Sequence, residues 1–81
     1  MKTEERIKHI LSELSGEKSI ETKARLQEDL SLDSLSMVTM LVEIEDSFSI
    51  ELDEKDMNPF DLITVADVIK LTEGYIGDEN E

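Results

Sequence analysis

The sequence predicts an all-α fold, a small bundle of three main helices and one short helix. Three stretches carry apolar residues at the spacing of one helical face, and residues typical of helix caps flank them. No two alternating segments indicate a pair of β-strands. With 81 residues the chain has room for one small domain, which we expect to span residues 1–81, with a flexible tail at about residues 77–81.

The first helix is predicted at about residues 4–15. Thr3 can cap its start, and Gly16 can end it. Its apolar face is formed by Ile7, Ile10, Leu11 and Leu14. The lone His9 lies off this face and is predicted to be a surface residue.

The segment over residues 16–33 is longer than the usual connection between helices. It holds scattered apolar residues, among them Leu26 and Leu30, at positions from which they can reach the core. We therefore predict an ordered loop.

The second helix is predicted to begin at Ser34, and it is the most strongly amphipathic element of the chain. Its inner face is formed by Met37, Met40, Leu41, Ile44 and Phe48. Beyond it, Ile50 and Leu52 alternate with polar residues and indicate a short extended piece.

The remaining chain predicts a short helix or turn followed by a longer helix. Pro59 suits an early helical turn, and four apolar residues around it are expected to pack on the other helices: Met57, Phe60, Leu62 and Ile63. Thr64 and Asp67 resemble a capping arrangement for a helix over residues 65–76. The inner face of that helix is predicted to be Val65, Val68, Ile69, Thr72 and Ile76.

Composition limits the function. The chain carries 21 acidic and eight basic residues, a net charge of −13, so we expect no nucleic-acid partner, because phosphate binding needs a basic surface. There is no cysteine, hence no disulfide and no thiolate metal site. No segment is apolar enough to span a membrane, and the N-terminus lacks the pattern of a signal peptide. We expect a cytoplasmic monomer.

The acidic residues are unevenly placed. The stretch from Leu26 to Asp61 holds eleven acids and a single base, Lys55. Acidic residues support solubility, but the asymmetry favours a negative face that steers basic partners.

The stretch EDLSLDSLSMVTMLVEIEDSFSIEL resembles the central segment of acyl carrier proteins. Asp33, Ser34 and Leu35 match the Asp-Ser-Leu triplet at the start of the second helix in that family. Leu30 matches the leucine before the triplet, and Phe48 matches the aromatic residue at the helix end. The resemblance covers essentially the whole chain and implies the same order of helices.

The resemblance implies that 4'-phosphopantetheine is joined to Ser34 through a phosphodiester. It also implies that Asp33 helps a phosphopantetheinyl transferase handle its metal, and that Leu35 lies beside the modification site. The implied function is to hold acyl intermediates as thioesters on the arm and to shuttle them between enzymes of fatty acid or related acyl and polyketide synthesis. The chain itself would not be an enzyme.

The sequence departs from the family pattern in the residues before the serine. Many members have Gly-Ala-Asp-Ser, whereas this chain has Ser31, Leu32, Asp33 and Ser34. Without the glycine, we expect a loop that needs no positive φ there. A leucine just before Asp-Ser, here Leu32, is a feature similar to that of D-alanyl carrier proteins. Ser36 and Thr39 occupy positions where fatty-acid carriers often have acids. A D-alanyl or other aminoacyl or peptidyl carrier is therefore an alternative.

Two further groups of residues follow from the carrier interpretation. Partner enzymes with basic patches, which load or use the acyl group, are expected to meet Leu35, Val42, Glu43, Glu45 and Asp46. An acyl chain could shelter in the bundle against Met37, Met40, Leu41, Ile44 and Met57, because methionine repacks readily. The alternative for these five is ordinary core packing.

The same residues allow three other interpretations. Asp-Ser before an apolar run is a common capping pattern, so Ser34 could be only a cap. A calcium-binding loop starting at Asp29 lacks the glycine and the final glutamate that such loops need, and no metal site is predicted. An acidic adaptor bundle without a prosthetic group remains an alternative of a different class.

Overall fold

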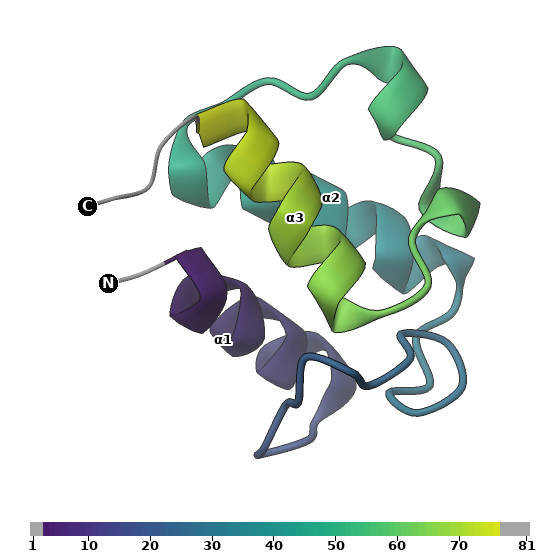
Figure 1. The fold of residues 1–81 in the computed structure, drawn as a ribbon. Helices are drawn as coiled ribbons and strands as arrows, with labels where there is room; N and C mark the ends of the chain where they lie inside the picture. Colours follow the sequence, from purple (N-terminus) through teal and green to yellow (C-terminus); the bar gives the residue numbers. More distant parts are fainter. Residues whose placement is uncertain (1–2, 77–81) are drawn as a thin grey trace.

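The computed structural model describes residues 3–76 and shows an all-α fold in this range (Figure 1). Three α-helices, α1 (Thr3–Ser15), α2 (Ser34–Phe48) and α3 (Val65–Ile76), are joined by a long loop and by two 3₁₀ turns, η1 (Glu54–Asp56) and η2 (Pro59–Asp61). The predicted fold class is confirmed. The tail expected to be flexible lies outside the described residues.

Helix α1 ends as its sequence predicts. Gly16 has a φ of +81°, and its N–H donates to the carbonyl oxygen of Ser12 at 2.9 Å, so the glycine supplies the left-handed conformation that ends the helix. At the other end of the described range, Thr3 already lies within the helix, so the prediction that it caps the helix was wrong. Helix α1 contacts both α2 and α3.

The C-terminal end of α2 is fixed to α1. Ser49 closes the helix in the left-handed conformation, with a φ of 56°. The guanidinium of Arg6 donates to the carbonyl oxygen of Ser47 at 2.7 Å and lies 5.4 Å from the ring centroid of Phe48. This cation–π contact joins the half-buried Phe48 to α1.

The long loop is ordered, as predicted, because its backbone pairs with the start of α3. The N–H of Leu26 donates to the carbonyl oxygen of Ile63 at 2.8 Å, and the N–H of Val65 donates to that of Ala24 at 3.0 Å. Within the described residues this gives one isolated antiparallel bridge, between Arg25 and Thr64, and no longer strand pairing.

The segment predicted as a short helix or turn forms two separate 3₁₀ turns, with Met57 and Asn58 between them. Leu62 is buried and Met57 half-buried, but Phe60 and Ile63 are exposed, so the prediction that all four pack inward was wrong for these two. Such short turns do not complete the face on which an α-helix would have aligned these side chains.

Helix α3 has the predicted bounds and the predicted capping box. The backbone N–H of Thr64 donates to Asp67 Oδ2 at 3.1 Å, and that of Asp67 donates to Thr64 Oγ1 at 3.3 Å. The inner face is buried as predicted except for Ile76 at its end. The buried hydroxyl of Thr72 donates to the carbonyl oxygen of Val68, which satisfies its polar group.

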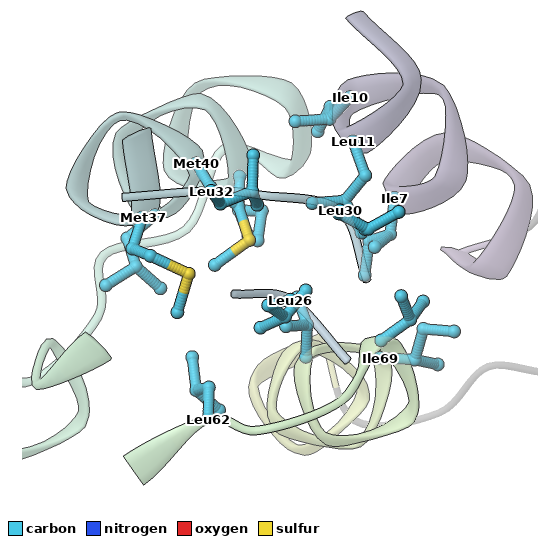
Figure 2. Close-up of a cluster of buried hydrophobic side chains, with 14 of the residues drawn as sticks. Ile7, Ile10, Leu11, Leu26, Leu30, Leu32, Met37, Met40, Leu62 and Ile69 are labelled. Atoms are coloured by element: carbon cyan, nitrogen blue, oxygen red, sulfur yellow. The ribbon is translucent and has the colours of Figure 1, made fainter. Parts of the chain in front are cut away.

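The core lies between the three helices and the loop (Figure 2). Its loop contribution is large, because Ile20, Leu26, Leu30 and Leu32 are all buried. Leu26 is fully buried, so truncating it to alanine would cost about 2–5 kcal/mol of stability. The long connection is therefore part of the folded core and holds the start of α2 in place.

Candidate functional site

The N-terminus of α2 presents Ser34 at the protein surface. Asp33, in extended conformation, caps the helix: its Oδ1 accepts the N–H of Ser36 at 2.8 Å. Ser34 is the first helical residue and is exposed. The cap is thus Asp33, and the serine hydroxyl is not needed for that role.

Hydrogen bonding keeps Asp33 ionised. The backbone N–H of Ser36 is the main cause that lowers the pKa of this carboxyl, with the Ser36 side chain adding to it. The site therefore pairs a neutral hydroxyl with an adjacent carboxylate at neutral pH.

The loop before the serine needs the left-handed conformation after all. Ser31 has a φ of 59°, at the position where many acyl carrier proteins have glycine, so the expectation of no positive φ was wrong. Burial alone does not require this conformation, because an extended chain would also bury Leu30 and Leu32 and expose Ser31 between them. The chain turns here instead: the N–H of Leu32 donates to the carbonyl oxygen of Leu26 at 3.1 Å.

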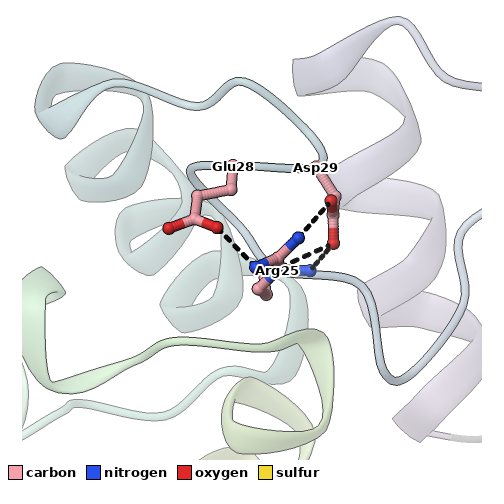
Figure 3. Close-up of polar contacts among 3 residues, drawn as sticks. All are labelled: Arg25, Glu28 and Asp29. Carbon is pink, nitrogen blue, oxygen red and sulfur yellow. Dashed lines mark hydrogen bonds and ion pairs between the residues drawn. The ribbon is translucent and has the colours of Figure 1, made fainter.

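An ion-paired cluster holds this loop (Figure 3). Asp29 Oδ2 accepts the backbone N–H of Arg25 at 2.8 Å, and both carboxylate oxygens accept from its guanidinium at 3.2 Å. Glu28 pairs with the same guanidinium at 2.6 Å. The side-chain hydrogen bond between Arg25 and Asp29 raises the pKa of the arginine and lowers that of the aspartate.

The α2 terminus suits an anion joined to Ser34. The first turn of α2 contains no acidic residue, whereas α1 has Glu4 and Glu5 there and α3 has Asp67. The first backbone N–H groups of a helix lack partners within it, and the helix dipole favours negative charge at this end. The residues present therefore fit a phosphodiester on the exposed hydroxyl.

Four of the five residues predicted to meet partners are exposed on α2. These are Leu35, Val42, Glu43 and Asp46. Glu45 differs, because its Oε2 accepts the N–H of Leu52 at 2.8 Å and the residue is half-buried. Its carboxylate holds the chain that leaves α2, so Glu45 has a structural role.

The residues predicted to shelter an acyl chain lie in the core. Met37, Met40, Leu41 and Ile44 are buried, and Met57 is half-buried at the core's edge. Figure 2 shows Met37 and Met40 pointing towards the loop leucine Leu26 and towards Leu62. In this structure the five pack as ordinary core residues.

Sequence reasoning missed a link between η1 and the end of α3. The hydroxyl of Tyr75 donates to Asp56 Oδ2 and accepts the N–H of Asp53 at 2.8 Å. The hydrogen bond to Asp56 raises the pKa of the Tyr75 phenol. Tyr75 is the only tyrosine of the chain, and this was the one feature of the sequence that could have drawn attention to it. Its partners could not be predicted, because Asp53 and Asp56 lie 22 and 19 positions away in the sequence.

Within residues 3–76, no three histidine or acidic side chains are grouped so that they could hold a metal ion. The carboxylate of Asp29, the first residue of the calcium-loop pattern, accepts hydrogen bonds from the backbone N–H and the guanidinium of Arg25. No helix in the same range is long and apolar enough to cross a membrane.

The fold and the site define a class: a small acidic helical protein that presents an exposed serine at the N-terminus of its second helix. The family described as "Phosphopantetheine attachment site" matches residues 5–72. An acyl carrier protein from Thermotoga maritima is 31% identical over 74 residues, 89% of each chain. The chain therefore belongs to the acyl carrier protein family, whose cofactor is 4'-phosphopantetheine, and the resemblance predicted from the sequence is confirmed.

Proposed function

We propose that this chain is a non-catalytic carrier that holds acyl intermediates as thioesters on a 4'-phosphopantetheine arm attached to Ser34. It passes them between enzymes of fatty acid or related acyl and polyketide synthesis. The observation that carries this proposal is the exposed hydroxyl of Ser34 at the start of α2, with Asp33 providing the helix cap.

Each residue at the α2 terminus has a part in this function. The arm, once attached, supplies a terminal thiol for the thioester, and the chain has no cysteine that could compete for the cargo. The helix dipole favours negative charge at the N-terminal end of α2, which stabilises the phosphodiester there. The Asp33 carboxylate is available to the metal of the modifying transferase, and Leu35 borders the attachment point.

The acidic outer face of α2 helps to select the enzymes that bind the carrier. Glu43 and Asp46 are exposed and attract the basic patches of the transferase and of the enzymes that load or use the acyl group. Exposed charges mainly speed encounter and add little tight affinity, which suits a protein that must leave each partner. The carrier acts as a single-domain monomer in the cytoplasm.

One observation favours a second cargo class, D-alanyl or another aminoacyl or peptidyl group. The first turn of α2 has no acid, and both Ser36 in that turn and Thr39 in the next occupy positions where fatty-acid carriers often have acids. Transfer of an activated amino acid to the modified chain by an adenylating enzyme would support this cargo. Charging by a malonyl or fatty acyl transferase alone would support the acyl cargo.

We also propose that the helical bundle shelters the acyl chain from solvent. A medium-length acyl chain on the arm would enter between the helices and displace the packing of Met37, Met40, Leu41, Ile44 and Met57. Nuclear Overhauser contacts between such a chain and the methionine methyl groups are expected. An acyl chain whose protons contact only solvent would contradict the shelter.

The main experiment is modification in vitro. We expect incubation with a phosphopantetheinyl transferase and coenzyme A to add one phosphopantetheine group, located at Ser34 by fragmentation mass spectrometry. Ser34→Ala should keep the circular dichroism spectrum and lose the modification. Ser36→Ala, which changes the next serine of the same helix, should still be modified. An unmodified parent protein would support the acidic adaptor bundle instead.

A further inference from the structure

The segment over residues 49–58, which we call the strap, covers one edge of the core between α2 and η2. Figure 1 shows it leaving α2, passing the C-terminal end of α3 and entering η1. Only Leu52 of the strap is buried; Ile50 and Met57 are half-buried and pack against the core, and η1 has no buried residue. A segment held by so few buried side chains is one that opens locally while the rest of the protein stays folded.

The first half of the strap is attached to α2. The N–H of Ile50 donates to the carbonyl oxygen of Glu45 at 3.1 Å, and the N–H of Leu52 donates to the carboxylate of the same glutamate at 2.8 Å. Together with the burial of Leu52, these bonds fix the chain up to this residue. Local opening is therefore confined to the part of the strap that follows Leu52.

The second half of the strap is attached to α3 by one side chain. The hydroxyl of Tyr75 accepts the backbone N–H of Asp53 at 2.8 Å and donates to Asp56 Oδ2. Within residues 3–76, no other helix forms a hydrogen bond or an ion pair with residues 53–57. A single phenol thus holds η1 against the bundle.

This attachment is reversible. Asp53 is exposed, and Asp56 and Tyr75 are only half-buried, so water can replace both hydrogen bonds when the strap lifts, and each bond adds only modestly to stability. Turn η1 keeps its own hydrogen bond from the N–H of Met57 to the carbonyl oxygen of Glu54 at 3.1 Å. It can therefore move away from α3 as an intact turn.

Met57 is the point at which the strap meets the proposed acyl shelter. The other four residues of that shelter lie on α2 and are buried, whereas Met57 is half-buried at the core's edge. The wall of the shelter that solvent reaches is therefore the strap. Met57 directly follows Asp56, which Tyr75 holds, so releasing Tyr75 frees this wall.

We propose that Tyr75 is a latch on the strap and controls how readily an acyl chain on the Ser34 arm enters the core past Met57. The inference rests on the proposed function, and it assigns a regulator to the shelter. A chain that needs an open strap binds in the shelter in proportion to the fraction of molecules whose strap is open. Two hydrogen bonds to Tyr75 keep that fraction low.

The first test uses the unmodified chain and the oxidation of methionine by hydrogen peroxide, followed by peptide mass spectrometry. Tyr75→Phe keeps the ring and removes the hydroxyl, so the population with an open strap should rise about tenfold and Met57 should be oxidised several times faster. This rate should not respond to low urea, because local opening exposes little surface. Met37 and Met40 are fully buried, and their oxidation should rise steeply with urea.

Two neighbouring acids give a matched pair of variants. Asp56→Ala loses the carboxylate that Tyr75 binds and should also oxidise faster at Met57. Asp53→Ala removes the same charge but keeps the backbone N–H that Tyr75 accepts, and the Asp53 side chain does not cap η1, so its rate should equal that of the parent. Parent-like rates in both Tyr75→Phe and Asp56→Ala would overturn the latch. So would a Met57 rate that climbs with urea as steeply as those of the buried methionines.

The second test follows the acyl chain itself. A phosphopantetheinyl transferase with octanoyl coenzyme A would attach an octanoyl arm to Ser34, and nuclear Overhauser contacts from the octanoyl protons to the methionine methyl groups would report sheltering. In Tyr75→Phe the ratio of sheltered to solvent-exposed chain should rise about tenfold. An unchanged ratio would overturn control of the shelter by Tyr75.

The outcomes separate this inference from the proposed function. Complete modification of Ser34 with parent-like oxidation and sheltering in Tyr75→Phe would overturn the latch and leave the carrier function standing. A parent protein that is never modified would overturn the carrier function, while the oxidation rates would still decide whether Tyr75 holds the strap. Circular dichroism verifies that each variant is folded, and Tyr75→Phe and Asp56→Ala give independent readings.

Discussion

Asp33 accepts the N–H of Ser36 at 2.8 Å, and this one hydrogen bond separates the two roles that the Asp-Ser pair could share. The aspartate caps α2, and the serine between the bonded residues is left exposed. The helix cap and the exposed hydroxyl at this terminus therefore belong to different side chains, so the hydroxyl can be removed by mutation without removing the cap.

The first prediction concerns Asp33. An asparagine at this position would cap α2 about as well as the aspartate does, so Asp33→Asn should melt at a temperature close to that of the parent, whereas Asp33→Ala should melt lower. Both variants lack the carboxylate and should be modified more slowly at a fixed transferase concentration. Parent-like modification of Asp33→Asn would contradict a role for the charge.

The second prediction concerns the left-handed residue in the loop. Ser31→Gly should stabilise the protein by about 0.5–1 kcal/mol, because glycine adopts positive φ without steric cost. Ser49→Gly, at the other positive φ of a described non-glycine residue, should act in the same direction. Ser19→Gly is the control and should be neutral or destabilising. Urea unfolding measures all three, and a less stable Ser31→Gly would refute the argument.

The third prediction uses Asp67 in the capping box of α3. Asp67→Ala should cost about 1 kcal/mol at pH 7, while Asp61→Ala, at an exposed acid, should cost almost nothing. The backbone N–H of Thr64 is the main cause that lowers the pKa of Asp67 below its ordinary value of 3.8. The unfolded chain then binds the proton more readily, so the contribution is complete above that value and is lost as the pH falls through the folded pKa. Unfolding curves at pH 7 and in acid should show the gap between parent and Asp67→Ala closing.

The fourth prediction concerns Tyr75, whose hydroxyl ties α3 to η1. Its pKa is raised above 10.0, chiefly by the hydrogen bond to Asp56, so the folded state keeps the proton longer than the unfolded state. Its stabilisation is complete below pH 10 and is lost as the pH rises through the folded value. Tyr75→Phe should be less stable at pH 8, and the difference from the parent should shrink in more alkaline solution. A constant difference in denaturant unfolding would contradict this linkage.

The fifth prediction follows from the charge of −13. Sodium chloride should raise the melting temperature, because the screening length falls from about 30 Å at 0.01 M salt to about 8 Å at 0.15 M. A variant with Asp53→Asn and Glu54→Gln, two exposed acids, should depend less on salt. Melting curves that do not respond to salt would argue against self-repulsion.

Local patterns predicted the local structure well. The periodicity of α1, α2 and α3, the glycine at the end of α1 and the capping pair Thr64 and Asp67 concern residues within a few positions of each other. Propensity and side-chain capping act over the same distances, so the sequence could specify them. The local pattern around Ser34 indicated only a helix cap, and the resemblance to acyl carrier proteins was needed to single this serine out as the attachment site.

The errors arose where distant residues decide. The positive φ of Ser31 belongs to a turn in which the N–H of Leu32 reaches back to the carbonyl oxygen of Leu26. The bond from the N–H of Leu52 to Glu45 was likewise not predicted. The outward Phe60 and Ile63 follow from 3₁₀ turns whose backbone is fixed by Asp67 and Leu26.

By itself, the sequence determined the helices, the acidic surface and the exposed serine at the start of α2, because these depend on spacing, composition and caps. Only the tertiary structure decided which side chains the core leaves outside. The core is close-packed and has room for only some of the apolar side chains. Which of them are buried depends on contacts between residues far apart in the sequence, so a residue's neighbours in the sequence do not predict it.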